Sequence, residues 1–287
     1  MQVSKTGVLM ISSISEQLFT PVSARFDVIV AGGGPAGFAA AVGAARMGNS
    51  VALFDVNGAL GGVWTAGLLC HIIDWRNKSG TMAEIMTRLR AEGGAAEDDH
   101  SYDPEVMKYV LDSMARESGI RVQLHTRVVA AQHDLGRVSS IATESKSGRE
   151  AWQAAVFIDA TGDGDLAALA GCGFEIGHPV TGETQPMSLM AVLAGLNDVN
   201  VAPFVCGPRH GHKTPKERLL SILREGGLEP SYSAPTLFKI ADGLYALMGN
   251  HEYGVSALDA HAITQASMNA RSELRQIEVD PGIRTSW

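Results

Sequence analysis

Three glycines with the spacing G-x-G-x-x-G are the residues best suited to bind a dinucleotide. They are Gly32, Gly34 and Gly37; they follow the apolar run 26–31 and precede an alanine-rich stretch that ends at Gly48. Between a strand and a helix, the first glycine permits a tight turn, the second lets the backbone approach a pyrophosphate, and the third lets the helix pack closely on the strand. The N–H groups and partial positive charge at the helix start attract phosphate. The spacing therefore predicts a phosphate-binding turn.

An acidic residue, Asp55, ends the next apolar run, 50–55. A carboxylate there, about twenty residues past the turn, accepts hydrogen bonds from the adenosine ribose and disfavours a 2′-phosphate. The two runs and the helix between them have the length of a βαβ unit, about thirty residues. The alternative is a structural glycine turn, with Asp55 merely closing a strand. This unit predicts a dinucleotide site without deciding between NAD and FAD.

A second glycine-rich loop, 60–67, carries the pair Gly61 and Gly62 next to apolar Val63 and Trp64. Backbone N–H groups in such a loop can approach another part of a long dinucleotide, and loops beside binding sites usually carry function. The alternative is a plain surface loop, which the apolar residues disfavour. We therefore expect this loop to contact a cofactor or a substrate.

A third segment, 156–160, reads as a buried strand that ends at Ala160, Thr161 and Gly162. Ligands bind at the carboxyl ends of strands in open α/β sheets, so this end is expected beside the cofactor. Asp163 and Asp165 follow. Two roles stay open for them, capping of the next helix and a hydrogen bond to a ribitol or ribose hydroxyl, and capping is at least as favoured for Asp165.

Taken together, these motifs resemble the FAD-dependent oxidoreductase family, whose members share the glutathione-reductase type of FAD-binding fold. The resemblance is strong over residues 26–196 and weaker through 259–276. It rests on the segments GGGPAGFAAAVGAARMG, VALFD, LGGVWTAG, YDPEVMKYVLDSMARESGIRVQLHTRVVAA, FIDATGDGDLAALAG and TQPMSLM.

The resemblance implies FAD as the cofactor and assigns residues to each part of it. Asp55 stands where the family has an acid, usually Glu, for the adenosine ribose, and Val128 matches the position whose backbone meets the adenine. The residues expected to hold the pyrophosphate are Gly32, Gly34, Pro35, Ala36 and Gly37. Gly61 and Gly62 are expected near the flavin. The strand end that is expected to close over the nucleotide is Ala160, Thr161 and Gly162. Family members run on past the point where this sequence ends, with a Gly-Asp element near the ribitol and flavin. The resemblance therefore implies a form truncated at the C-terminus.

Candidate catalytic residues are less well defined, and no catalytic set is assigned. His71 follows the second glycine loop and is the candidate acid–base group, with Asp74 and Arg76 nearby; Arg76 is suited to an anionic substrate. The alternative for all three is an ordinary loop with solvated charges. Cys70 lacks a visible orienting partner for a nucleophilic thiolate. His210 and His212 form H-x-H without a third ligand at recognisable spacing, so no metal site is expected.

Hydrophobic periodicity places these motifs in an α/β fold. We expect an N-terminal tail, 1–24, then a Rossmann-like FAD-binding domain with a parallel central sheet and an antiparallel β-meander, 25–177, then a smaller, incomplete α+β cap or substrate region, 178–287. The meander strands are expected at 127–133, 137–143 and 149–155. Later strands are expected at 187–193 and on either side of Asp242-Gly243, with helices at 81–92, from 103 or 104, at 165–170, 214–224 and 259–276.

Composition limits the classes of partner. The net charge of −8 disfavours general nucleic-acid binding, and no apolar run approaches the length of a membrane span, about 20 residues. The three cysteines include no C-x-x-C pair, which disfavours a redox-active disulfide and favours reduced thiols in the cytoplasm. We therefore expect a cytoplasmic protein with a small-molecule substrate, no nucleic acid and no membrane. The sequence leaves the oligomeric state open.

The leading hypothesis is an FAD-dependent oxidoreductase in which a small-molecule substrate gives a hydride to the flavin. One alternative is an NAD-dependent dehydrogenase, although simple NAD domains lack the meander and the Ala160-Thr161-Gly162 strand end. The other alternative is a catalytically silent or truncated nucleotide-binding module. The substrate and the electron acceptor are not specified by the sequence.

Overall fold

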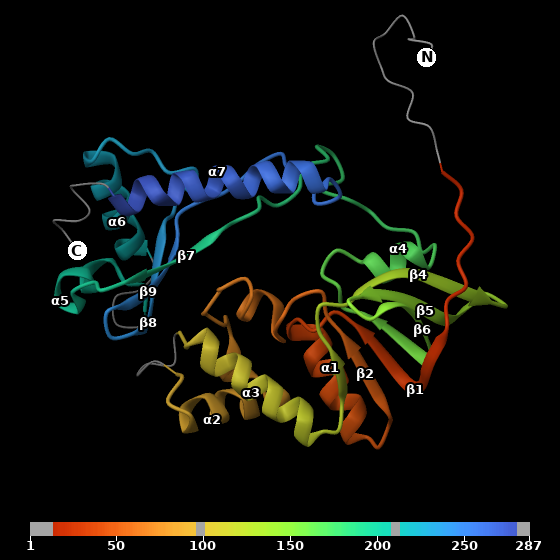
Figure 1. Cartoon of the computed structure of the whole chain (residues 1–287). Coiled ribbons are helices and arrows are strands. Elements are labelled where there is room, and N and C mark those ends of the chain that lie inside the picture. The colour runs from red at the N-terminus through yellow and green to blue at the C-terminus, as the bar shows by residue number, and fades with distance from the viewer. Residues whose placement is uncertain (1–13, 96–100, 208–212, 280–287) are drawn as a thin grey trace, which may run out of the picture.

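Two β-sheets organise the chain (Figure 1). The computed structural model describes residues 14–95, 101–207 and 213–279. A six-stranded sheet has the order β3-β2-β1-β6-β5-β4, and a three-stranded antiparallel sheet has the order β7-β9-β8. Within the larger sheet β1, β2, β3 and β6 are parallel, whereas β4 and β5 are antiparallel. The expected α/β class with a parallel central sheet is therefore confirmed.

The N-terminal unit is β1 (Val22–Ala31), α1 (Pro35–Arg46) and β2 (Val51–Phe54). The strands pair in parallel, with Ile29 opposite Ala52, so the connection must cross over through α1. All of β2 and the last four residues of β1 are buried, as expected for a sheet covered on both faces. β1 begins earlier than the apolar run predicts because its first half pairs with β6, from Val22 opposite Ala151.

Helices α2 (Thr81–Ala91) and α3 (Pro104–Glu117) come next, then the short strand β3 (Arg121–Gln123). Proline suits the first turn of α3, where its missing N–H costs no helical hydrogen bond. The Asp103 carboxylate accepts a hydrogen bond from the Glu105 N–H and caps the helix. Single 3₁₀ turns lie at Gly62–Trp64 and Trp75–Asn77, in the connection between β2 and α2.

The meander consists of β4 (Arg127–Asp134), β5 (Arg137–Ser145) and β6 (Gly148–Asp159). The sequence interpretation divided β6 into a third meander strand and a separate buried strand, and that division is wrong. β6 is continuous: its first half pairs with β5 up to Gln153, and from Ala151 onwards it pairs with β1. Its second half is also less buried than expected, with Val156 49% exposed, because β5 does not extend along it.

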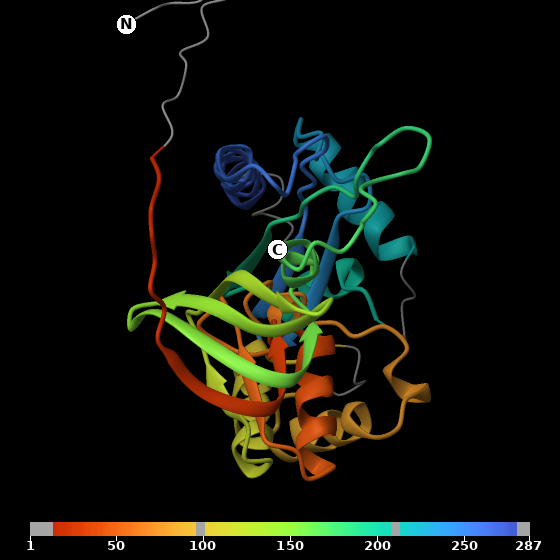
Figure 2. The ribbon, with the colours of Figure 1, turned by 90° about the vertical axis from the view of Figure 1, so that its right-hand side faces the viewer.

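The second sheet is formed by β7 (Met190–Ala194), β8 (Thr236–Ala241) and β9 (Leu244–Met248). Helix α4 (Asp165–Leu169) follows β6 and packs on the larger sheet, with Leu166 in the same apolar cluster as Val128 of β4. The helical segments of the second half are α5 (Asp198–Val201), the 3₁₀ turn Ala202–Phe204, α6 (Lys213–Glu225) and α7 (Ala260–Val279). Figure 2 shows α6 and α7 at the side of the molecule opposite β1 and β2. β7 starts three residues later than expected, and Met187 forms only an isolated bridge with Glu252. Among the described helices, none has both the length and the apolar character needed to span a bilayer.

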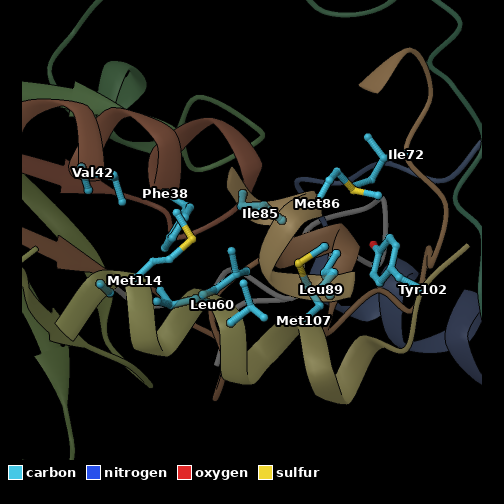
Figure 3. Close-up of a cluster of buried hydrophobic side chains, with 14 of the residues drawn as sticks. Phe38, Val42, Leu60, Ile72, Ile85, Met86, Leu89, Tyr102, Met107 and Met114 are labelled. Atoms are coloured by element: carbon cyan, nitrogen blue, oxygen red, sulfur yellow. The ribbon is translucent and has the colours of Figure 1, made fainter. Parts of the chain in front are cut away.

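Strands β8 and β9 of the second sheet are buried on both faces. Phe238, Ile240 and Ala246 belong to the same apolar cluster as α1, α2 and α3, which Figure 3 shows around Leu60 and Phe38. The alternate residues Leu237 and Leu247 belong to a second cluster, with side chains of α6 and α7. This two-residue alternation places the second sheet between the helices of the first unit and its own helices. The sheet is thereby fixed against the N-terminal unit.

Candidate dinucleotide-binding site

A cavity of about 400 Å³ lies at the carboxyl ends of β1, β2 and β6, beside the start of β4. This is the edge at which open α/β sheets bind ligands. The lining residues are Gly32, Gly34, Pro35, Ala36, Phe54, Asp55, Val56, Asn57, Gly62, Val63, Thr126, Arg127, Val128, Ala160, Thr161, Gly162 and Asp165. The structure thus brings ten of the twelve expected cofactor residues to one cavity. The other two, Gly37 and Gly61, do not line it.

The glycine turn is shaped by close backbone contacts. Gly32 has φ +99°, and a Cβ on it would lie 2.2 Å from the Ala160 carbonyl oxygen. A Cβ on Gly37 would lie 1.8 Å from the Gly32 carbonyl oxygen. Side chains at these two positions are therefore sterically excluded, because α1, the turn and the end of β6 pack backbone to backbone.

Gly34 is different because a side chain there would meet only open space. In the described part of the chain, no heavy atom lies within 4 Å of its Cβ position, and Gly34 borders the cavity. Gly34 occupies the N-cap position of α1 and has no side chain with which to cap the helix, and Pro35 follows it. The N-terminus of α1 thus opens into a cradle that a Cβ would fill. Its N–H groups and helix dipole suit the pyrophosphate of a dinucleotide.

The Asp55 carboxylate is buried and accepts hydrogen bonds from two backbone N–H groups of the protein. Only 5% of the residue is exposed. One oxygen accepts a hydrogen bond from the Gly33 N–H at 2.5 Å, and the other accepts from the Asn57 N–H at 2.6 Å. A carboxylate has about four acceptor positions, so capacity for a ribose hydroxyl remains. Asp55 therefore fixes the glycine turn as well as bordering the place expected for the ribose.

The second glycine loop is attached to the first. The Gly61 N–H donates to the Gly33 carbonyl oxygen at 2.8 Å, and a Cβ on Gly62 would lie 3.0 Å from the Gly34 Cα. Farther along the loop, the buried Tyr102 hydroxyl lies within hydrogen-bond distance of the Trp64 and Leu69 carbonyl oxygens. Tyr102 comes from the segment before α3, a partner that the loop's own sequence could not indicate. The loop is thereby held against the cavity.

At the end of β6, Asp159 organises the turn that enters α4. Its carboxylate accepts hydrogen bonds from the Thr161 N–H and hydroxyl and from the Ala167 N–H. Burial raises the pKa of Asp159, but these hydrogen bonds outweigh it and hold the pKa below its usual range. The capping role considered for Asp163 and Asp165 is contradicted: Gly164 occupies the N-cap position, and the Asp159 carboxylate accepts from the Ala167 N–H in the first turn.

The turn between β3 and β4 forms the far end of the cavity. The Thr126 N–H donates to the Asp55 carbonyl oxygen at 2.8 Å, which places Thr126, Arg127 and Val128 beside the end of β2. Sequence reasoning selected Val128 through the resemblance and missed its neighbours, as well as Asn57. The signal that could have identified them was adjacency, because each lies within two residues of a residue already selected.

The catalytic candidates lie outside the lining of this cavity. The His71 ring stacks on Phe238 of β8, with 5.5 Å between ring centroids, and Arg76 lies over the Trp75 ring. Asp74 is exposed. Cys70 is fully buried, and burial raises its pKa to about 12, so its thiol is neutral near pH 7, which disfavours a thiolate nucleophile. His210 and His212 lie outside the described residues, and no metal-binding cluster occurs within them.

Several solved structures share the fold of this chain at low sequence identity. A geranylgeranyl bacteriochlorophyll reductase-like protein from Thermoplasma acidophilum aligns with a TM-score of 0.55 at 18% identity, covering 91% of this chain and 63% of that one. The myxobacterial chondrochloren halogenase, described as FAD-dependent, aligns with a TM-score of 0.55 at 16% identity, covering 91% and 59%. A p-nitrophenol 4-monooxygenase from Pseudomonas putida aligns with a TM-score of 0.52 at 11% identity, covering 91% of this chain and 64% of that one.

These likenesses establish the fold, and the chain spans about three fifths of the length of these relatives. No curated protein sequence matches it. The family model described as FAD dependent oxidoreductase matches residues 27–285, which include the glycine turn, the second glycine loop and the second sheet. With a match of that extent, this chain belongs to the FAD-dependent oxidoreductase family, whose cofactor is FAD.

Proposed function

We propose that this protein is an FAD-dependent oxidoreductase that takes a hydride from a small-molecule substrate. When bound, FAD would supply the two-electron redox chemistry, and a second acceptor would reoxidise it. One observation carries the proposal: the open cradle at Gly34 faces a cavity at the carboxyl edge of the sheet. No described side chain occupies the cradle, and the helix N-terminus beside it suits a pyrophosphate.

The chain's own residues account for binding the nucleotide half. The N-terminus of α1 would hold the pyrophosphate, and the Asp55 carboxylate would accept from the ribose while it fixes the Gly33 N–H. Thr161 and Gly162 border the same cavity from β6, and Gly62 borders it from the second loop. The hydrogen bonds that the Asp55 and Asp159 carboxylates accept from backbone N–H groups fix these turns before any ligand arrives. Such preorganisation reduces the entropy lost on binding.

The substrate side is proposed to lie toward the second sheet. We propose that 25–177 forms the cofactor domain and 178–287 the cap. The cap's β8 contacts the cofactor domain through Phe238, on which His71 stacks. His71 therefore stays the candidate acid–base group, since its half-buried ring lies where the second glycine loop meets the cap. The three cysteines form no disulfide, which fits a reducing compartment, and we propose the cytoplasm.

The test is anaerobic reduction of the FAD-loaded protein by a panel of small amines, alcohols, amino acids and hydroxy acids, with NADH and NADPH as further donors. The proposal expects the visible flavin absorption to bleach with at least one small-molecule donor and to return when an electron acceptor is added. A protein that binds FAD but is bleached by no donor except dithionite would support a catalytically silent module. A protein that binds NAD and not FAD would support the dehydrogenase alternative.

A further inference from the structure

Arg127 is the only basic residue among the described residues that line the cavity. Its side chain is exposed, and no described carboxylate lies within ion-pair distance of it. The residue opposite it on β5 is Glu144, but the Glu144 carboxylate is paired with Arg149 at 2.6 Å. Arg127 is thus a cation on the cavity lining that forms no ion pair with a described carboxylate.

The strand order locates Arg127 relative to the cofactor. Along the carboxyl edge of the sheet, the glycine turn follows β1, Asp55 follows β2, and the turn leading to Arg127 follows β3. Adjacent strands are separated by about 4.8 Å, so this turn lies about 10 Å from the end of β1. A pyrophosphate at the start of α1 and a ribose beside Asp55 therefore direct the adenine toward Arg127.

The chemistry of this end suits a flat aromatic ring better than a second anion. Val56 and Val128 supply apolar surface on the lining, and Thr126 is buried beside them. The charged groups of the cavity besides Arg127 are Asp55 and Asp165, both acidic. A planar guanidinium stacks on aromatic faces, and base stacking on arginine is a recurring mode of nucleotide binding.

We propose that the Arg127 guanidinium lies over the adenine ring of FAD and makes this site select FAD over FMN, which lacks the adenosine. The inference rests on the proposed function, because it assumes that FAD occupies the cavity. It assigns Arg127 a specificity role that the glycine turn cannot provide, since FAD and FMN both carry phosphate.

The test is equilibrium binding of FAD, FMN and ADP to the apoprotein, followed by flavin fluorescence or calorimetry. Arg127→Ala is expected to raise the Kd for FAD about tenfold, near the lower end of the loss seen when a stacking partner of a base is removed. The Kd for ADP, which retains the adenosine and pyrophosphate, should rise by the same factor, and the Kd for FMN should not change. Arg127→Lys should behave like the alanine variant, because the lysine ammonium lacks the planar stacking surface.

Arg137→Ala is the matched control, because Arg137 is an exposed arginine at the opposite end of the β4–β5 hairpin and outside the cavity lining. It should leave all three dissociation constants unchanged. An equal loss of FMN affinity in Arg127→Ala would overturn the proposal, as would a lysine variant with wild-type FAD affinity or an alanine variant within twofold of wild type. If the wild-type chain binds no FAD at all, the proposed function fails first, and this inference fails with it.

Discussion

Adding a single methyl group at Gly34 should separate cofactor binding from folding. The Cβ of Gly34→Ala would meet no described heavy atom within 4 Å, and the Gly34 backbone, with φ −67° and ψ −175°, is extended and open to any residue. The folded chain should therefore tolerate alanine, and its unfolding temperature should change little, because the lower preference for alanine at the N-cap offsets the entropy gained by restricting the unfolded chain. The methyl group would, however, project into the cradle at the N-terminus of α1.

The expected loss follows from the hydrogen bonds that the methyl group would prevent. Hydrogen bonds between N–H groups and a charged partner contribute about 1.5–3 kcal/mol each. Loss of one such bond should therefore raise the Kd for FAD about ten- to hundredfold. Calorimetric or fluorescence titration of apoprotein with FAD measures this change, and thermal unfolding measures stability in parallel.

Gly43→Ala is the matched control on the same helix. Its Cβ also meets no described heavy atom within 4 Å, but Gly43 is exposed in the helix interior and does not line the cavity. This variant should be stabilised by about 0.5–1 kcal/mol, with unchanged FAD affinity. If Gly34→Ala bound FAD as tightly as Gly43→Ala does, the phosphate would not occupy the cradle and the placement of the cofactor would be refuted.

Three further predictions concern the groups that hold the site. Asp55→Asn replaces a charged acceptor of the Gly33 N–H, so urea unfolding should show a loss of about 1–3 kcal/mol, and an unchanged midpoint would contradict the role of the carboxylate in fixing the turn. Because Cys70 and Cys206 are buried with raised pKa values whereas Cys172 is exposed, a thiol reagent at pH 8 should modify one thiol quickly in the native protein and all three after denaturation; rapid modification of all three in the native state would be inconsistent with this burial. The pKa of Asp159 is lower in the folded state than in the unfolded state, so its stabilisation is present above the unfolded value, near pH 4, and is lost as the pH falls through the folded value. Asp159→Asn should therefore reduce the fall in unfolding temperature between about pH 5 and pH 3, and an unaltered acid profile would count against it.

The sequence predicted those parts of the site that depend on local backbone. The glycine spacing identifies a turn because Gly32 and Gly37 are excluded from carrying side chains by contacts within the strand–turn–helix and with its neighbouring strand. The second sheet was partly predictable too, since alternation and the Asp242-Gly243 turn define β8 and β9.

Features that depend on distant partners were not predictable. The apolar run 156–160 resembles a strand buried on both faces, yet Val156 is half exposed because β5 ends its pairing at Gln153. The stacking of His71 on Phe238 joins residues far apart in the chain. Asp163 and Asp165 have good capping chemistry, but Asp159, at the end of β6, satisfies the first turn of α4 in their place.

The central claim is that this chain holds FAD in the cavity at the carboxyl edge of its larger sheet. The most direct measurement is the visible spectrum of the protein after incubation with FAD and gel filtration, with the released nucleotide identified by mass. The account predicts flavin bands that co-elute with the protein near one FAD per chain, and their loss in Gly34→Ala but not in Gly43→Ala. A colourless protein, or flavin retained equally by both variants, would contradict it.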